Sequence, residues 1–384
     1  MEEMTKYLKR SIILLVLSLF FLSIHIQLAI NFSVKKTAYH VVNRISRQIQ
    51  ERHFSRKISS TNKTGSMDNY RNKLYIVMNS PAGHASYVGN NENCTDIRDK
   101  TNCILSCPET SPKLVGRKTP YLFIPTTTKL KTALSWVKNG GRYSPYGCIP
   151  RHHVAVIIPF RDRDQHLKTF LYNIHPFLRR QQLDYGIYII EQIGTSKFNR
   201  AMLMNIGYAE SIKIHKYTCF VFHDVDLLPE DDRNSYTCTT QPRHLSAAVD
   251  KFKYRLPYKA IFGGASALSQ SQLQSVNGFS NKFFGWGGED DDMWNRLMHA
   301  NFTVTRHSNK IARYTMLRHG KEKGNKHNTK RYKLLEDGYK RFKKDGLNSL
   351  TYNVVRIQIN PLYTRISVDI NEKEVMKVNA YFYT

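Results

Sequence analysis

Three short, continuous apolar segments, separated by stretches with helical periodicity, constrain the fold of this chain more than any other feature. The segments are residues 154–158, 185–190 and 217–222. An apolar run without polar alternation is typical of a strand buried on both faces, as in a parallel sheet. Between the first two segments, apolar residues recur at helical spacing at Leu167, Phe170, Leu171 and Ile174. Pro176 predicts the end of that helix.

A second helical stretch separates the second and third apolar segments and carries Met202, Ile206 and Ala209 on one face. Strands that alternate with helices are the pattern of a doubly wound α/β sheet, so we expect an α/β fold. Ligands of such sheets bind beyond the carboxyl ends of the strands. The segments to inspect for function are residues 159–163, 191–200 and 223–226.

Residues 12–30 are a candidate membrane anchor, because 15 of these 19 residues are apolar and the length suits one spanning helix. A cleaved signal peptide is the alternative, but the run exceeds a usual signal core and no clear cleavage site follows. We expect a cytoplasmic tail at 1–11, an uncleaved span at 12–30, a polar stem at 31–102 and a luminal domain at 103–384.

The six cysteines and the net charge of +28 constrain the compartment and the ligands. All cysteines follow the apolar run, and an even number on one side of a membrane indicates an oxidising lumen with disulfides. Sequons at Asn62, Asn93 and Asn301 lie on the same side. The basic charge fits a solvated surface, an anionic membrane or an anionic substrate such as a nucleotide diphosphate. Nucleic acid is not expected as a partner, because the basic stretch 318–344 would lie in the lumen.

Asp224 and Asp226 stand directly after the third apolar segment. Two carboxylates at this spacing past a buried strand are either turn residues or ligands of a divalent cation that holds phosphates. Met316 and His319, three residues apart, form a second weak signal, because a thioether and an imidazole can complete a metal site with a carboxylate.

The most specific signal is the run of four carboxylates from Glu289 to Asp292, which follows Trp286 and two glycines. Adjacent carboxylates repel one another, which raises some of their pKa values unless a cation or sugar hydroxyls intervene. The glycines allow close approach of the backbone, and the indole offers a flat face for a sugar ring. The alternative is an acidic helix N-terminus stabilised by the helix dipole, since residues 293–297 look helical. The two interpretations are compatible.

These segments together resemble the β-1,4-galactosyltransferase family, glycosyltransferase family 7, from about Cys107 to Asp369. The matching segments are residues 158–163, 198–201, 222–226, 262–268, 286–292, 316–319, 331–332 and 347–352. The resemblance implies a GT-A-type, Rossmann-like nucleotide-sugar fold in one catalytic domain at 103–384. It also implies an inverting mechanism and a single-pass type II protein of the Golgi membrane, with the catalytic domain in the lumen.

The resemblance implies roles for individual residues. Mn²⁺ would be bound by Asp226, Met316 and His319 together with the diphosphate of a UDP-sugar. Asp290 would be the general base that takes the proton of the acceptor's 4-hydroxyl, and Glu289 would position the sugars. Further substrate-binding residues would be Pro159, Phe160, Arg161, Arg163, Phe198, Arg200, Asp224, Val225, Lys251, Tyr258, Ile261, Trp286, Gly288, Arg331, Tyr332 and Leu335. The last three would form the pocket for the acetyl group of a terminal N-acetylglucosamine (GlcNAc) acceptor.

The resemblance also implies two mobile loops, one at Trp286, which would close over the site, and one at about residues 317–337. It implies two disulfides, Cys107–Cys148 and Cys219–Cys238. Cys94 and Cys103 are then expected to pair with each other.

Ile261 departs from the usual pattern of the family. Members that transfer galactose usually carry Tyr at this position, which lies against the C2 substituent of the donor sugar. Ile is shorter and leaves room for an N-acetyl group, as in the invertebrate β-1,4-N-acetylgalactosaminyltransferase members. We therefore expect transfer of N-acetylgalactosamine (GalNAc) from UDP-GalNAc to the 4-hydroxyl of terminal β-GlcNAc on glycoproteins or glycolipids, forming GalNAcβ1-4GlcNAc. The alternative is a β-1,4-galactosyltransferase that uses UDP-Gal on the same acceptor.

Overall fold

The computed structural model describes residues 105–318, 320 and 325–377. The predicted tail, membrane anchor and stem, the Cys94–Cys103 pair and the expected metal ligand His319 lie outside these residues. Within the described ranges, no helix is both long and apolar enough to cross a membrane.

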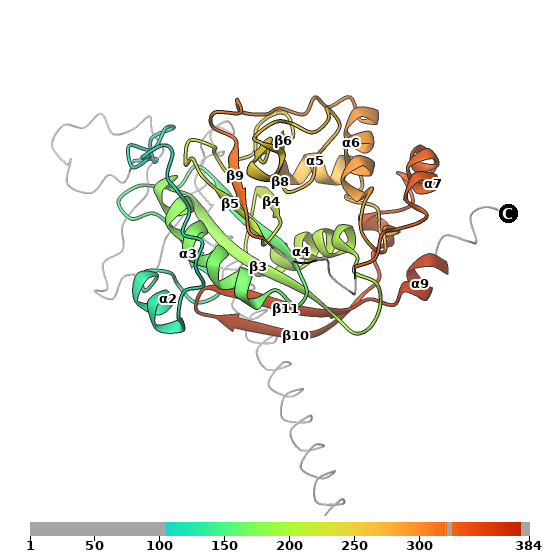
Figure 1. Cartoon of the computed structure of the whole chain (residues 1–384), viewed down its shortest axis with the longest axis horizontal. Coiled ribbons are helices and arrows are strands. Elements are labelled where there is room, and N and C mark those ends of the chain that lie inside the picture. Colours follow the sequence, from blue (N-terminus) through green and yellow to red (C-terminus); the bar gives the residue numbers. More distant parts are fainter. Residues whose placement is uncertain (1–104, 319, 321–324, 378–384) are drawn as a thin grey trace, which may run out of the picture. The chain divides into compact units, whose positions relative to one another are not determined.

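A mixed eight-stranded sheet forms the framework of the described domain (Figure 1). Its centre is parallel and consists, in order, of β11 (Tyr363–Asp369), β3 (Asp184–Ile193), β2 (His153–Phe160) and β4 (Cys219–His223). Antiparallel strands continue it as β10 (Asn353–Asn360) on one side, β8 (Ala265–Ser269) and β6 (Arg243–His244) on the other, and β1 (Arg142–Tyr143) beside β3. The predicted α/β fold with a parallel sheet is confirmed.

Strand β2 shows why the apolar runs lack alternation. Val154 and Val156 pack in the cluster that contains the apolar face of α3 (Asp164–Arg180). Ala155 and Ile157 pack in the cluster that contains α4 (Arg200–Ile214). Because a helix covers each face, every residue of the strand from Val154 to Phe160 is buried. This is the packing that the sequence predicted.

The predicted helix end at Pro176 is wrong, since α3 continues to Arg180 with Pro176 inside it. A proline inside a helix cannot donate a hydrogen bond to the preceding turn, and this cost normally favours termination. Phe177 and Leu178, which follow the proline, are only 3% and 0% exposed. Their burial against the core stabilises the last turn beyond the proline.

A smaller three-stranded sheet is formed by β5 (Leu227–Pro229), β9 (Arg313–Met316) and β7 (Ala248–Val249). The remaining helical elements are α2 (Thr127–Ala133), η1 (Asp250–Phe252), α5 (Gln270–Ser275), α6 (Glu289–His299), α7 (Arg331–Glu336), α8 (Gly338–Arg341), η2 (Leu347–Ser349) and α9 (Glu372–Lys377). The small sheet joins the residues that follow β4 to the segment that leads into the second predicted loop.

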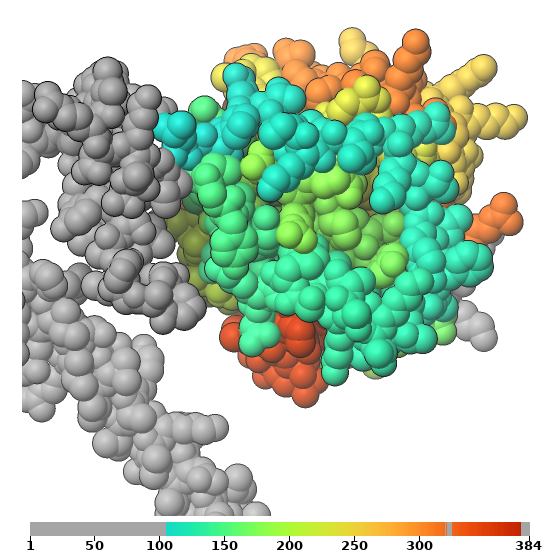
Figure 2. Space-filling view, turned by 90° about the vertical axis from the view of Figure 1, so that its left-hand side faces the viewer, coloured from blue at the N-terminus to red at the C-terminus, as the bar shows by residue number. Residues whose placement is uncertain are grey.

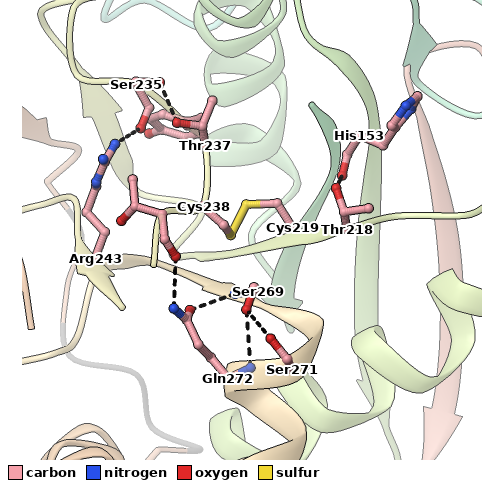
Figure 3. The surroundings of a disulfide bond; sticks show 12 residues. His153, Thr218, Cys219, Ser235, Thr237, Cys238, Arg243, Ser269, Ser271 and Gln272 are labelled. Carbon is pink, nitrogen blue, oxygen red and sulfur yellow. Dashed lines mark hydrogen bonds between the residues drawn. A yellow bond between two sulfur atoms is a disulfide. The ribbon is translucent and has the colours of Figure 1, made fainter. Parts of the chain in front are cut away.

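The two disulfides expected in the described domain are present. Cys107–Cys148 fastens the first described residues, and Figure 2 shows this early part of the chain spread over one face of the domain. Cys219–Cys238 ties the start of β4 to the segment before β6 (Figure 3). Both disulfides close connections around the sheet and leave the carboxyl ends of the strands open.

Candidate active site

Strand β4 and the small sheet bring the first acidic motif next to Met316. β4 ends at His223, so Asp224 and Asp226 follow it directly. Leu227 and Met316 are partners in the β5–β9 ladder, and the Leu317 amide donates to the Asp226 carbonyl at 2.7 Å. Asp226 and Met316, 90 residues apart in the sequence, therefore lie side by side.

A buried hydrogen-bond chain fixes the turn that carries this motif. His223 is fully buried, and its Nδ1 donates to the Asp224 carbonyl at 2.8 Å. Its Nε2 then accepts from the Tyr236 hydroxyl at 2.8 Å, and Tyr236 also contacts the Tyr314 hydroxyl at 2.8 Å. Burial lowers the pKa of His223 to about 4, so the ring is neutral near pH 7. Tyr236 and Tyr314 were not predicted, because neither stands in a recognisable motif.

Arg200 connects the two acidic motifs. It is the first residue of α4, and its Nε donates to Asp224 Oδ1 at 2.7 Å. Its Nη1 lies 3.5 Å from Glu289 Oε1 at the start of α6. Burial raises the pKa of Asp224 to about 6, and the charge of Arg200 opposes this rise. One guanidinium thus holds carboxylates from two elements that are distant in sequence.

Asp290 sits against a glycine backbone next to this bridge. A Cβ atom on Gly263 would lie only 2.7 Å from Asp290 Oδ2, so the absence of a side chain there makes room for the carboxylate. Burial raises the pKa of Asp290 to about 7, and the charges of Glu289 and Asp291 add to this rise. A carboxyl group with such a pKa can accept a proton near neutral pH.

The acidic run opens helix α6, which begins at Glu289 and has all four carboxylates in its first turn. The predicted acidic helix N-terminus is therefore confirmed. The four side chains have different surroundings. Asp291 hydrogen bonds to the Tyr258 hydroxyl and helps to raise its pKa, although burial contributes most to that rise.

Asp292 points into the core. Its Oδ2 accepts from Arg296 Nε at 2.6 Å, and both side chains are at most 1% exposed. Arg341 lies 3.7 Å from the other oxygen, and Arg341 and Arg296 also approach Asp345 at 3.4 Å and 3.7 Å. Asp292 thus belongs to a buried ion cluster behind the site.

The segment of Ile261 is held by two residues that the sequence did not reveal. Arg306 Nη2 donates to the Ile261 carbonyl at 2.8 Å, and Arg306 Nε donates to His244 Nδ1 at 3.0 Å. His244 Nε2 in turn donates to the Gly263 carbonyl at 2.9 Å. Burial, together with the charge of Arg306, lowers the pKa of His244 to about 3 and keeps it neutral. The backbone from Ile261 to Gly263 is thereby fixed beside Asp290.

The two segments predicted as mobile loops lie against each other. The Trp286 amide donates to the Lys326 carbonyl at 3.0 Å, and the Asn328 amide donates to the Trp286 carbonyl at 3.0 Å. The indole is 56% exposed and packs edge-on against His327, with ring centroids 4.8 Å apart. The flanking glycines at 285, 287 and 288 have φ between 91° and 102°, a region that favours glycine.

The residues expected on the donor side follow β2 and β3. Arg161 Nη2 donates to the Ser196 carbonyl at 2.9 Å, and its guanidinium lies 5.4 Å from the Phe198 ring centroid. Pro159 and Phe160 end β2, and Phe160 is only 1% exposed, so its ring belongs to the core. Arg163 follows as the N-cap residue of α3.

Two further groups of expected residues flank the acidic cluster. Lys251 is in η1, next to Asp250. The Asp250 carboxylate accepts from the Met316 amide at 2.9 Å, so the backbone of Lys251 lies near Met316 in space. Arg331, Tyr332 and Leu335 share helix α7, which packs against α6. Arg331 Nη2 donates to the Tyr332 hydroxyl at 2.9 Å, and this tyrosine ring is 70% exposed.

Matches to known protein families assign this mixed α/β domain to the glycosyltransferases. Residues 107–239 match the protein family described as "N-terminal region of glycosyl transferase group 7". Residues 243–320 match the family described as "N-terminal domain of galactosyltransferase". The chain is 48% identical over 298 residues to β-1,4-galactosyltransferase 1 of Mus musculus, covering 76% of this chain and 75% of the relative. It is 51% identical over 271 residues to the same enzyme of Bos taurus, covering 70% and 67%. The chain belongs to glycosyltransferase group 7, the family of the β-1,4-galactosyltransferases.

Solved structures show the same fold. The catalytic domain of Drosophila β-1,4-galactosyltransferase 7 in complex with xylobiose matches with a TM-score of 0.50 and 28% identity, over 59% of this chain and 98% of that one. A point mutant of the same enzyme, in complex with manganese, UDP-Gal and xylobiose, matches with a TM-score of 0.50 and 27% identity, over 60% and 99%.

Proposed function

We propose that this chain is a manganese-dependent, inverting glycosyltransferase that transfers GalNAc from UDP-GalNAc to the 4-hydroxyl of a terminal β-GlcNAc. The observation that carries the proposal is the Arg200 bridge. Asp224, which follows β4, and Glu289, which opens α6, both contact this one guanidinium, at 2.7 Å and 3.5 Å. The proposed donor site and the proposed base therefore share one place at the carboxyl ends of the strands.

Asp226 and Met316 are suited to hold Mn²⁺, and we propose His319 as the third ligand. The ladder between β5 and β9 places the first two side by side, and a carboxylate with a neutral thioether leaves the bound ion net positive. Bound there, Mn²⁺ would neutralise charge on the departing diphosphate. The Drosophila relative in complex with manganese and UDP-Gal supports manganese as the ion.

Asp290 is proposed as the base of the transfer step. Its raised pKa of about 7 suits a group that must take up a proton near neutral pH. As O4 of the acceptor bonds to the anomeric carbon, its proton passes to the Asp290 carboxylate. The bond between that carbon and the UDP oxygen breaks on the opposite side, so the configuration is inverted. Glu289 would orient the sugars.

The acceptor would bind between α6 and α7. Arg331, Tyr332 and Leu335 lie on α7, and Trp286 is joined to the segment that leads into it. The Arg331 guanidinium lies 5.6 Å from the Trp286 ring and 4.7 Å from the Tyr332 ring. Exposed aromatic faces of this kind suit stacking against a sugar ring.

The choice of donor is proposed from Ile261. The contacts of Arg306 with the Ile261 carbonyl and of His244 with the Gly263 carbonyl fix this segment, so the size of side chain 261 should decide what the pocket admits. UDP-Gal is the second candidate donor, and the names of the relatives, which are β-1,4-galactosyltransferases, favour it.

A donor comparison tests both candidates. Purified protein with Mn²⁺ and a GlcNAc-terminated acceptor would receive labelled UDP-GalNAc or UDP-Gal at equal concentrations. We expect a higher kcat/KM for UDP-GalNAc, and equal or faster transfer from UDP-Gal would contradict the proposed donor. Ile261→Tyr should shift the ratio towards galactose, whereas the matched control Ile261→Leu should not. An unchanged ratio in Ile261→Tyr would show that another residue selects the donor.

We further propose that the enzyme is a type II protein of the Golgi membrane, with the anchor at residues 12–30 and the catalytic domain in the lumen. The apolar run and the disulfides in the described domain support this arrangement. In intact microsomes, added protease should leave the catalytic domain uncut until detergent is present. Digestion without detergent would overturn the proposed orientation.

A further inference from the structure

Three potential metal ligands converge at the opposite edge of the sheet from the candidate active site. They are His153 at the start of β2, Asp184 at the start of β3 and His215 directly after α4. Their ligand atoms all lie within 4.8 Å of one another, and within the described ranges no other trio of His, Cys, Asp or Glu does so. The eight residues of β2 place this edge roughly 23 Å from the residues that follow the strand.

The sheet itself sets the geometry of this trio. His153 and Asp184 are partners in the parallel ladder of β2 and β3, and His153 Nδ1 lies 2.9 Å from Asp184 Oδ2. His215 Nε2 lies 3.4 Å from the same oxygen. Tetrahedral zinc with bonds of about 2.0–2.1 Å places its ligand atoms about 3.3 Å apart. The separations of 2.9 Å and 3.4 Å between Asp184 Oδ2 and the two imidazole nitrogens therefore lie on either side of this zinc value.

The polar atoms at this edge are incompletely satisfied. His215 Nε2 and Asp184 Oδ1 are buried and make no hydrogen bond of good geometry among the described residues, only longer contacts of 3.4 Å to Asp184 Oδ2 and 3.7 Å to Arg142. The ring of His215 packs against Tyr217 with centroids 4.9 Å apart, which orients Nε2 towards the carboxylate. The side chain of His153 is 37% exposed, so water or another ligand can reach a fourth position. Buried polar atoms with incomplete hydrogen bonding are uncommon, and a bound cation would satisfy these two side chains.

The two oxygens of Asp184 have different neighbours. Arg142 Nη2 lies 3.7 Å from Oδ1, whereas both imidazoles approach Oδ2. Oδ2 is therefore the oxygen that lies between the two rings.

We propose that His153, Asp184 and His215 bind a divalent cation of the zinc class, at a site separate from the proposed manganese site. Two imidazoles and one carboxylate form a ligand set typical of Zn²⁺, and nitrogen ligands bind zinc more tightly than manganese. His153 would bind the cation through Nδ1 as its Nε2–H tautomer, in place of its hydrogen bond to Asp184. The cation joins the starts of two central strands to the end of α4.

The site adjoins the second disulfide. The carbonyl of His153 accepts from the Thr218 amide at 3.0 Å, and Thr218 precedes Cys219 (Figure 3). In Figure 3 the His153 imidazole points away from the disulfide. The cation and the disulfide therefore fasten the same edge of the sheet from two sides and should add to the stability of the domain without touching the substrate.

Zinc binding tests the proposal directly. The purified full chain, freed of metal with a chelator and then saturated with Mn²⁺, would be titrated with Zn²⁺ by calorimetry. We expect one site in the wild type and a melting temperature that rises with zinc. His215→Gln and Asp184→Asn should each weaken this site by at least about 10-fold. His152→Gln removes the neighbouring histidine outside the trio and should leave it intact.

A second measurement needs no variant that perturbs folding. Zinc should protect His153 and His215 of the wild-type chain from a histidine-modifying reagent while His152 stays reactive, as read by mass spectrometry. Asp226→Asn, which alters the proposed manganese site, should leave zinc protection unchanged. Absence of zinc binding, undiminished binding in the two trio variants, or equal modification with and without zinc would each overturn the proposal. None of these readouts depends on sugar transfer.

Discussion

The first turn of α6 contributes carboxylates to two clusters that balance charge differently. On the side of the site, Asp224, Glu289 and Asp290 surround the single guanidinium of Arg200. On the other side, the buried ion cluster pairs two carboxylates with two guanidiniums, and every member is at most 5% exposed. Its members are Asp292, Arg296, Arg341 and Asp345. Consecutive residues of one sequence motif thus take part in both.

This difference in charge balance suggests a structural role for the buried ion cluster and the proposed catalytic role for the cluster around Arg200. The buried ion cluster is neutral by itself and needs no ligand, so its effect is on folding. The cluster around Arg200 has an excess of negative charge, and burial together with the charges of Glu289 and Asp291 raises the pKa of Asp290 to about 7. A bound cation or a proton taken up by a carboxylate would offset such an excess. Four predictions test this contrast.

Asp290→Asn should have the largest effect on transfer. Loss of the proposed base is expected to reduce kcat by about 10²–10⁴-fold, while binding of UDP, measured by calorimetry with Mn²⁺, stays unchanged. Asp337→Asn, which removes an exposed carboxylate paired with Lys340 at 3.0 Å, is the matched control and should keep full activity. Comparable kcat in both variants would remove Asp290 from the mechanism.

Arg296→Met should affect folding first. It leaves Asp292 and Asp345 buried with only Arg341 between them, which costs about 3–5 kcal/mol. Thermal or denaturant unfolding would measure the loss. The double variant Arg296→Met/Asp292→Leu restores charge balance and should be more stable than Arg296→Met alone. A double variant that is less stable would show that packing, and not charge, holds this cluster together.

Gly263→Ala should reduce kcat without reducing stability to the same extent. The new Cβ would lie 2.7 Å from Asp290 Oδ2, so the carboxylate must shift. A displacement of about 1 Å at a reacting group can cost about 10²-fold in rate. The affinity for UDP should stay unchanged, because the new methyl group is directed at Asp290 and not at Asp224 or Asp226. An unchanged kcat would mean that Asp290 is not held by this backbone.

The pH profile should show the smallest effect. The proposed base acts in its ionised form, so kcat/KM should fall below about pH 7, by about tenfold for each further pH unit. Unfolding curves at the same pH values would separate this loss from loss of structure. A flat profile down to pH 5 would contradict a raised pKa for the base.

Much of the fold was predictable because burial leaves a local record. The three apolar runs correspond to β2, β3 and β4, and the two helical stretches to α3 and α4, since alternate residues of these runs pack in apolar clusters on the two faces of the sheet. The family resemblance also gave both described disulfides. The helix end at Pro176 was wrong because a local rule cannot include the burial of Phe177 and Leu178.

The sequence by itself determined the chemical inventory of the site: the carboxylates after β4, the acidic start of α6, and the aliphatic residue at position 261. Only the tertiary structure decided which partner each charge has. Arg200 joins Asp224 to Glu289, while Asp292 turns to Arg296 in the core. Likewise, His153 and His215 meet at Asp184 only because the sheet aligns their elements. The physical reason is that residue type and spacing encode burial, whereas the energy of a charge depends on distances to residues far along the chain.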